Sequence, residues 1–449
     1  MRLVYTALFY GAVPLIVLRL LWRGRSNPAY RDRIGERFGA YGPTMPRRDV
    51  IWIHAVSVGE TESAAPLVHQ LRDRYPDIPL LLTTTTPTGS ARVQALFGSS
   101  VEHCYLPYDL PGPIARFLGR FRPRLAVILE TEIWPNLFGA CSARRIPLVI
   151  ANARLSSRSA VRYRYIGGLV RPALAAVRAI AAQTPEDAER FAAIGADPKK
   201  ISVTGNIKFD VDYGQGLIAN GRGLREELFG RRPVIIAAST HAGEEERLLS
   251  IFSGLRQRFA GLLLMLVPRH PERFAAVASL ARAAGFHTVR RSDGIPCSGA
   301  DEVFVLDTIG ELRTFYAAAD VAFVGGSLVP VGGHNVLEPA MAGLPVMFGP
   351  HVDNFRVICA ALVEAGGAFA TDGESSLAAA LERLLDDAVL RAEMGERAQA
   401  YVLRNRGALN RVTAILAAYL GSDASVVLSS ASIDEASSNA SNGAGRPMK

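Results

Sequence analysis

The sequence predicts an α/β protein with two doubly wound parallel sheets in tandem. From residue 50 onward, short β-branched apolar runs alternate with helical patterns, which is typical of parallel α/β layers. The chain of 449 residues is also too long for one ordinary core. A glycine-punctuated stretch without clear periodicity, residues 210–232, separates two such series. We therefore expect domains at residues 23–209 and 233–421, joined by this stretch as a linker.

Each series supplies candidate strands that are short and apolar. In the first half they are residues 50–54, 80–84, 125–129, 147–150 and 179–182. In the second half they are residues 234–238, 262–267, 303–306, 321–324 and 345–348. Helices are expected near residues 62–74, 88–97, 185–194, 244–259, 271–284, 311–318, 336–342 and 388–419. Doubly wound sheets bind ligands at the carboxyl ends of their strands, so we expect a cleft between the carboxyl edges of the two sheets.

The first 22 residues predict a membrane anchor. Residues 3–22 are largely apolar with one charge, Arg19, and the cluster of arginines follows the apolar run, which is the reverse of a signal peptide. Pro14 leaves open whether the helix spans the membrane or lies in its interface, and a buried helix of a soluble protein is a third interpretation. By the positive-inside rule, the arginines keep the rest of the chain at the cytoplasmic face. They are Arg19, Arg23, Arg25, Arg31, Arg33, Arg37, Arg47 and Arg48, against Asp32 and Glu36.

Composition excludes several classes of protein. The four cysteines are far apart and form no CxxC pair, which argues against a zinc site and a disulfide framework. The histidines His54, His241 and His270 lack metal-ligand spacing, so we expect no metal site. Basic charge clusters beside the apolar segment and shows no signature of a groove lined by alternating basic and aromatic residues, so we expect no nucleic-acid partner. Residues 422–449 are rich in Ser, Ala, Asn and Gly and are expected to be disordered.

A glycine-rich loop in the second half predicts a nucleotide site. Residues 325–345 read GGSLVPVGGHNVLEPAMAGLP after a strand, and a helix is expected to begin near Asn335. Glycines allow backbone N–H groups to approach a phosphate, and a helix N-terminus favours an anion. Glu338, one turn into that helix, suits a ribose diol. The competing interpretation is a tight structural turn in which Asn335 only caps the helix.

Two other loops follow strands of the same expected sheet. Pro268 and Arg269 come directly after one apolar strand, where the guanidinium fork of arginine can pair with phosphate or carboxylate. Residues 307–311 follow another strand and offer backbone groups beside a base or phosphate. Each loop alone resembles an ordinary capping loop. Three loops at the carboxyl edge of one sheet together favour nucleotide binding.

The first half places carboxylates where a general base is useful. Residues 54–62 run from a strand through a small-residue turn to Glu60, and no GxGxxG motif is present, which disfavours a nicotinamide enzyme. A cleft carboxylate can take the proton of an attacking hydroxyl, although Glu60 can also simply complement the helix dipole. Glu130 follows another apolar strand. Lys208, near the end of the first half, can neutralise an acidic sugar or phosphate, or be an ordinary surface lysine.

The chain resembles the 3-deoxy-D-manno-octulosonic acid (Kdo) transferase family from the apolar segment to about residue 420. Eight motifs carry the resemblance, in order HAVSVGE (54–60), ETEIWPN (130–136), NARLS (152–156), GNIKFD (205–210), ASTHAGEEE (238–246), VPRHPERF (267–274), DTIGEL (307–312) and GGSLVPVGGHNVLEP (325–339). The resemblance implies a GT-B fold and an inverting transfer of Kdo from CMP-Kdo to the tetraacyl disaccharide precursor of lipid A. It implies no metal in the transfer, and we expect no cofactor. The enzyme would work at the cytoplasmic face of the inner membrane of a Gram-negative bacterium.

The resemblance also implies roles for individual residues. Glu60 matches the general base, and Glu130 and Lys208 match positions that support the transition state. The first domain would bind the acceptor and the second the CMP-sugar. The residues that match CMP-binding segments are Pro268, Arg269, Ile309, Gly310, Glu311, Asn335, Val336, Leu337 and Glu338.

Two other functions stay open from the residues alone. A different GT-B transferase with a UDP-hexose donor is compatible with the glycine-rich loop and Glu338. A catalytically inactive lipid- or nucleotide-binding module is disfavoured because Glu60 and Lys208 are both present.

Overall fold

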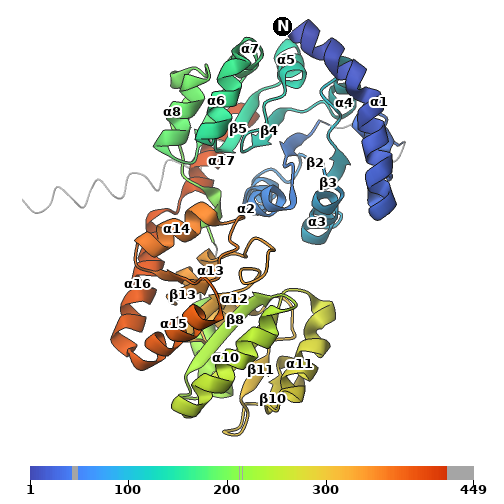
Figure 1. Cartoon of the computed structure of the whole chain (residues 1–449). Coiled ribbons are helices and arrows are strands. Elements are labelled where there is room, and N and C mark those ends of the chain that lie inside the picture. The colour runs from blue at the N-terminus through green and yellow to red at the C-terminus, as the bar shows by residue number, and fades with distance from the viewer. Residues whose placement is uncertain (43–48, 212, 215, 422–449) are drawn as a thin grey trace, which may run out of the picture. The chain divides into compact units, whose positions relative to one another are not determined.

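A computed structural model describes residues 1–42, 49–211, 213, 214 and 216–421 (Figure 1). The chain folds into two compact units. The first contains Met1–Ile207 and Gly407–Lys449, and the second contains Lys208–Arg406. The tail for which we predicted disorder, residues 422–449, lies outside the described residues, as do Arg47 and Arg48.

The first unit is built on a seven-stranded parallel sheet with the order β3-β2-β1-β4-β5-β6-β7. Side chains alternate between its faces, so that Trp52 packs with α4 and α5 while Ile51 and Ile53 pack with α2, α3 and α17. The strands are β1 (Ile51–His54), β2 (Leu80–Thr84), β3 (Glu102–Tyr105), β4 (Leu125–Leu129), β5 (Leu148–Ala153), β6 (Ala179–Ala182) and β7 (Ile201–Val203). The helices are α1 (Arg2–Ser26), α2 (Val58–Arg74), α3 (Pro87–Phe97), α4 (Pro111–Phe121), α5 (Pro135–Ala143), α6 (Ser157–Tyr165), α7 (Gly167–Ala175), α8 (Pro185–Ala193) and α17 (Ala408–Leu420), with short 3-10 turns η1 (Pro28–Tyr30), η2 (Ile34–Phe38) and η3 (Pro198–Lys200).

The second unit repeats this design with the strand order β10-β11-β9-β8-β12-β13-β14, again all parallel. Helices α10, α11 and α15 cover one face of the sheet, and α9, α12, α13 and α14 cover the other. The strands are β8 (Val234–Thr240), β9 (Leu263–Pro268), β10 (Thr288–Arg290), β11 (Val303–Val305), β12 (Val321–Val324), β13 (Val346–Phe348) and β14 (Ala368–Ala370). The helices are α9 (Leu217–Leu228), α10 (Glu244–Arg258), α11 (Phe274–Ala283), α12 (Leu312–Tyr316), α13 (Leu337–Met341), α14 (Arg356–Glu364), α15 (Glu374–Asp386) and α16 (Ala388–Arg404), with η4 (Ile207–Phe209), η5 (Pro271–Arg273) and η6 (Arg291–Asp293).

The predicted α/β class and both doubly wound sheets are confirmed, and every predicted strand is present. The structure adds four strands that the sequence did not predict, namely β3, β7, β10 and β14. These four are the two edges of each sheet. Their residues are only partly buried, so they lack the continuous apolar run that marks a central parallel strand.

The segment interpreted as a linker, residues 210–232, differs from that expectation because it contains α9. This helix packs against α12 within the second unit, and Leu228 is buried in the core there. Gly221 explains both the close packing of α9 on α12 and the glycine-punctuated pattern that indicated a linker. A Cβ atom at residue 221 would lie 2.4 Å from the carbonyl oxygen of Thr314, so only glycine allows the two helices to approach this closely.

The predicted helix 388–419 is in fact two helices, α16 and α17. Gly407 separates them with a φ of 91°, a left-handed conformation that glycine adopts without strain. Ala408, Val412 and Leu416 of α17 are buried beside the first sheet. The chain therefore returns to the first unit at residue 407, whereas the sequence placed it in the second domain up to residue 421.

Helix α1 is exposed along most of its length. Within α1, which the structure describes throughout, only Leu20 and Gly24 are buried. Its length and apolar composition are sufficient to cross a membrane. A minor face contacts the first unit, where Phe9 lies 6.4 Å from the Tyr108 ring. The exposure disagrees with the interpretation of this segment as a buried core helix and fits a membrane anchor.

Candidate active site

Glu60 lies in the first turn of α2, directly beyond the carboxyl end of β1. Ser57 begins the helix as its N-cap, which turns the Glu60 side chain back toward the preceding loop. One carboxylate oxygen of Glu60 accepts a hydrogen bond from the backbone N–H of Val56 at 2.8 Å. The Ser57 hydroxyl makes a longer contact of 3.4 Å with the other oxygen.

The surroundings of Glu60 favour its protonated form. Burial, and to a smaller extent the neighbouring carboxylates of Glu130 and Glu132, raise the pKa of Glu60 to about 8, although the hydrogen bonds from Val56 and Ser57 act in the opposite direction. A carboxyl group with a pKa near 8 exchanges its proton close to physiological pH. Such a group is suited to general acid–base chemistry.

Glu130 and Glu132 complete an acidic cluster at the carboxyl edge of the first sheet. Glu130 follows β4 directly and has a φ of 57°, a conformation that is strained for a residue with a side chain. Its N–H still bonds the carbonyl oxygen of Ala151, so the strain is held in place by the sheet. Glu132 accepts a hydrogen bond from the Trp134 indole at 2.8 Å, and burial raises its pKa. We had not predicted Glu132, although its spacing from Glu130 in ETEIWPN was a usable signal.

The glycine-rich loop of the second unit is arranged differently from our expectation. The carboxylate of Glu244, fully buried at the start of α10, accepts the backbone N–H groups of Gly326, Ser327 and Leu328 at 2.7–3.0 Å. It also accepts the N–H of His241 at 3.0 Å. These loop N–H groups are therefore occupied by an internal anion. A ligand phosphate would have to use other donors.

Asn335 lies just before α13, whose N-cap residue is Val336. The side-chain oxygen of Asn335 accepts the N–H of Leu337 at 3.0 Å, and the helix that follows has only five residues. The side chains of Val336 and Leu337 are buried in the core, so only their backbone groups are available to a ligand. Glu338 accepts a hydrogen bond from Arg313 at 3.1 Å, while its carbonyl oxygen accepts the Tyr213 hydroxyl.

Positively charged and imidazole groups gather where β8, β9 and β12 end. The Nε2 atoms of His241 and His334 are 2.8 Å apart, and the His270 ring lies 5.3 Å from that of His241. Burial, together with the positive charge of Arg269, lowers the pKa of His334 to about 3, so this ring is neutral. Arg269 is fixed by its backbone N–H, which donates to the Thr240 carbonyl oxygen at 3.0 Å. Across the residues that the structure describes, no three His, Cys, Asp or Glu side chains are placed to hold a metal ion.

The third predicted nucleotide segment forms an exposed turn after β11. Gly310 has a φ of 94°, and Ile309 is 80% exposed. Glu311 pairs with Arg291 at 3.0 Å. Burial acts to raise the pKa of Glu311, but hydrogen bonds from Arg291 and Thr308 outweigh it and lower the pKa.

The second unit thus brings its three predicted segments to one sheet edge. Arg269 interacts electrostatically with His334, next to Asn335, and Arg313, just after Glu311, pairs with Glu338. Lys208 is the first residue of this unit, where its ammonium lies 5.1 Å from the centre of the Phe355 ring. Glu60 and Glu130 belong to the first unit, where their carboxylates interact.

Comparison with known proteins identifies the family. A family model for 3-deoxy-D-manno-octulosonic acid transferases matches residues 32–211. The 3-deoxy-D-manno-octulosonic acid transferase of Haemophilus influenzae is 43% identical over 421 residues, which cover 93% of this chain and 99% of that protein. The chain belongs to the Kdo transferase family. The Bordetella pertussis Kdo transferase agrees, with 38% identity over 434 residues covering 94% of this chain and 100% of that protein.

Membership of the Kdo transferase family confirms the resemblance predicted from the motifs and makes the chain a glycosyltransferase. The MurG structure from Acinetobacter baumannii is similar in fold alone, with 15% identity, a TM-score of 0.53 and coverage of 82% of this chain and 99% of that one. Together with two parallel seven-stranded sheets, this likeness confirms the GT-B fold.

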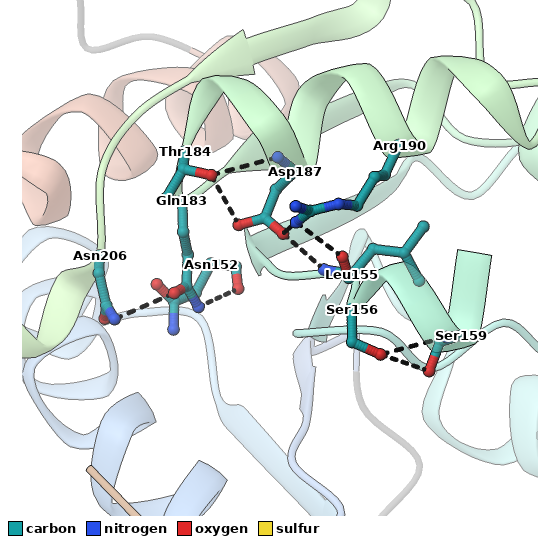
Figure 2. Close-up of polar contacts among 9 residues, drawn as sticks. All are labelled: Asn152, Leu155, Ser156, Ser159, Gln183, Thr184, Asp187, Arg190 and Asn206. Atoms are coloured by element: carbon teal, nitrogen blue, oxygen red, sulfur yellow. Dashed lines mark hydrogen bonds and ion pairs between the residues drawn. The ribbon is translucent and has the colours of Figure 1, made fainter. Parts of the chain in front are cut away.

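Part of the Kdo transferase motif set is structural. Figure 2 shows Asn152, Gln183 and Asn206, which follow or end β5, β6 and β7, joined in one amide network. Asn206 donates to the Gln183 side chain at 3.0 Å, and Gln183 donates to the Asn152 carbonyl oxygen at 2.9 Å. The Asn152 side chain accepts the N–H of Ile207 at 3.1 Å. In NARLS, Leu155 donates its N–H to Asp187 at 2.8 Å. These contacts fix the loops at the carboxyl edge.

Proposed function

We propose that this chain is an inverting transferase that moves Kdo from CMP-Kdo to the phosphorylated, acylated disaccharide precursor of lipid A. The observation that carries this proposal is Glu60, a partly buried carboxyl group with a pKa of about 8 beside two other carboxylates. Transfer of a sugar to a hydroxyl requires a base that can accept a proton near neutral pH. We infer the identity of the transferred sugar from family membership. We infer the identity of the base from the position of Glu60 at a sheet edge.

In the proposed reaction, Glu60 takes the proton from the acceptor hydroxyl as its oxygen attacks the anomeric carbon of Kdo. The bond from that carbon to the phosphate oxygen breaks on the opposite face, so CMP leaves with the electron pair and the configuration inverts. Glu130 stabilises the positive charge that develops on the sugar, and Lys208 offsets the charge of the donor carboxylate or phosphate.

The second unit would hold the donor. Arg269 would pair with the phosphate of CMP, and the exposed turn at Ile309–Glu311 together with Asn335–Glu338 would contact the nucleoside. Because Arg313 already pairs with Glu338, a ribose diol would share that carboxylate with the guanidinium. The first unit would bind the acceptor.

We further propose that α1 attaches the enzyme to the cytoplasmic face of the inner membrane. Its apolar side chains are exposed, with Leu3 85% and Leu15 69% exposed, and such a surface is unfavourable in water. Arginines at its end and just beyond suit anionic headgroups. This attachment would bring the first unit to the layer that contains a lipid acceptor.

The test is transfer from CMP-Kdo to the acylated acceptor, read by product mass and by CMP release. Replacing the donor with a UDP-hexose should give no product. Glu60→Gln should lower kcat by about 10²–10⁴-fold while CMP-Kdo binding, measured by calorimetry, stays unchanged.

The matched control is Glu62→Gln, two residues along the same helix, where Glu62 pairs with Arg92 at 2.9 Å. This variant should retain near wild-type kcat. Near wild-type kcat in Glu60→Gln would refute Glu60 as the base.

A further inference from the structure

An apolar groove runs between α1 and α4 in the first unit. Its volume is about 460 Å³. Its two walls are formed by Tyr10, Val13 and Pro14 from α1 and by Gly112, Pro113 and Arg116 from α4. None of these residues was assigned a role in catalysis above.

Helix α1, which forms one wall of the groove, also carries the apolar surface that we propose to lie in the membrane. Leu8, Leu15 and Leu18 of α1 are each more than 60% exposed. Apolar walls of this kind are unfavourable in water and favourable around a hydrocarbon chain. The chemistry of the walls and of their neighbourhood therefore fits a lipid rather than a polar ligand.

Polar groups are present at the groove as well. Arg116 donates a hydrogen bond to the Phe38 carbonyl oxygen at 2.6 Å and carries a positive charge suited to an anionic lipid. Pro14 has no N–H, so the carbonyl oxygen of Tyr10 lacks its usual helical donor. An amide or hydroxyl of an acyl chain would supply one.

Hydrogen bonds join both helices of the groove to Asn136, in the segment that follows the acidic cluster. Asp109, just before α4, accepts the N–H groups of Asn136 and Leu137 at 3.0 and 2.8 Å. The Asn136 amide donates to Thr6 of α1 at 2.9 Å. Asn136 ends the ETEIWPN segment that contains Glu130 and Glu132. Both helices of the groove are therefore tied to the segment that carries the carboxylates.

We propose that this groove holds one fatty acyl chain of the acceptor lipid. The proposal rests on the proposed function for the identity of the acceptor. An acyl chain held between α1 and α4 orients the attached sugar toward the carboxyl edge of the same sheet, and Arg116 faces the anionic part of the lipid. Through this groove, the enzyme recognises the acceptor partly by its acyl chain.

Gly112 gives a precise way to fill the groove. A Cβ at residue 112 would lie 3.6 Å from Arg116 and 3.8 Å from the Tyr10 hydroxyl, which are ordinary contacts, so Gly112→Leu adds bulk without displacing the backbone. The matched control is Gly119→Leu on the same helix, where a Cβ meets nothing within 4 Å. Val13→Phe fills the same space from the opposite wall.

Transfer is measured with the acylated acceptor and with the same phosphorylated disaccharide after its acyl chains have been removed. Gly112→Leu should raise KM for the acylated acceptor roughly tenfold, the loss expected when about two methylene groups are no longer buried. It should leave kcat and the KM for the deacylated acceptor unchanged. Val13→Phe should behave in the same way, and Gly119→Leu should match the wild type.

A second readout does not depend on the transfer reaction. Diazirine-labelled myristic acid should cross-link to α1 and α4 of the wild type, as mapped by peptide mass, and this labelling should disappear in Gly112→Leu. Binding to vesicles of phosphatidylethanolamine and phosphatidylglycerol should be the same in both proteins. If the wild type transfers no sugar to the acylated acceptor, the proposed function is wrong. The cross-linking result alone then shows whether the groove binds an acyl chain.

Three results would overturn the proposal. Equal KM increases for both acceptors would show that Gly112→Leu disturbs the fold or the binding of the headgroup rather than the binding of an acyl chain. An unchanged KM for the acylated acceptor in both Gly112→Leu and Val13→Phe would show that no chain binds there. Loss of vesicle binding in Gly112→Leu would show that the groove binds the lipids of the membrane in general rather than the acceptor.

Discussion

The two sheets place a glutamate in corresponding positions, but the surroundings of the two side chains differ. Glu60 lies at the start of the helix after β1, and Glu244 lies at the start of the helix after β8. Glu244 is fully buried and its carboxylate receives four backbone N–H groups at 2.7–3.0 Å. Glu60 receives one backbone N–H and one long hydroxyl contact. Two carboxylates stand near Glu60.

This difference shows that burial alone does not determine what a carboxylate does. A carboxylate surrounded by N–H donors is stabilised as an anion and holds its loop in place. One with few donors and two carboxylates nearby is held partly neutral and can exchange a proton. The number and charge of the groups around each glutamate therefore separate the structural role of Glu244 in the second unit from the chemical role that we propose for Glu60 in the first.

The largest expected effect comes from removing the structural glutamate. Glu244→Ala leaves four backbone N–H groups without their acceptor in a buried site, so the free energy of unfolding of the second unit should fall by about 3–5 kcal/mol. Guanidinium unfolding followed by circular dichroism measures this change. Glu246→Ala, in the same helix turn, removes only an exposed acceptor of the Gly243 N–H at 3.0 Å and should cost about 1 kcal/mol or less. Equal losses in the two variants would contradict the structural role of Glu244.

A smaller effect is expected in the pH dependence of transfer. Because Glu60 must be ionised to accept a proton, kcat/KM should rise with pH and level off above a pKa of about 8. At pH 7 the rate should be roughly one-tenth of the plateau. Glu132→Gln removes a negative charge that raises the pKa of Glu60, so the midpoint should move to lower pH.

Glu246→Gln in the second unit is the control for this shift and should leave the midpoint unchanged. The amide oxygen introduced by Glu132→Gln can still accept the hydrogen bond from Trp134, so the substitution changes charge more than geometry. A midpoint that stays in place in Glu132→Gln would show that the acidic cluster does not set the pKa of the base.

The same comparison explains what could be predicted from the sequence. The central strands of both sheets are buried on two faces and read as apolar runs, so periodicity found all of them. The edge strands β7 and β10 carry exposed or half-exposed residues and give no such signal. Their existence depends on pairing with a neighbour that local sequence does not reveal.

Long-range packing accounts for the remaining differences in the fold. No local pattern shows that α17 packs on the first sheet, because its apolar stripe fits either unit equally well. Gly407 is the local sequence feature at the point where the chain returns to the first unit. In α9, Gly221 looked like a loop residue, but its role depends on α12, almost a hundred residues later.

At the site, sequence could identify the segments but not the partners of each side chain. The glycine-rich loop was found because glycines and a following helix are local features. That its N–H groups bind Glu244 depends on a residue 82 positions earlier in the chain. The raised pKa of Glu60 likewise depends on burial by the folded chain and, to a smaller extent, on Glu130 and Glu132, which strand order brings to the same edge.

The smallest expected effect is a pH-dependent change in stability at Glu60. The pKa of Glu60 is about 8 in the folded protein and near 4.5 in the unfolded chain, so the folded state binds more protons between these values. Stability therefore falls as pH rises through this window. Glu60→Gln removes this loss, and its thermal midpoint should exceed that of the wild type by a few degrees at pH 8.5, or about 1 kcal/mol.

The gain should be less than the full pKa shift implies, because an ionised side chain at the sheet edge can turn toward water. At pH 5 the two proteins should unfold at nearly the same temperature, since Glu60 is then protonated in the folded state and only partly ionised in the unfolded one. Glu62→Gln should show no such pH-dependent gain. A wild type that matched Glu60→Gln at both pH values would mean that the Glu60 carboxylate is as well accommodated as that of Glu244, and the distinction between the two sheet edges would be lost.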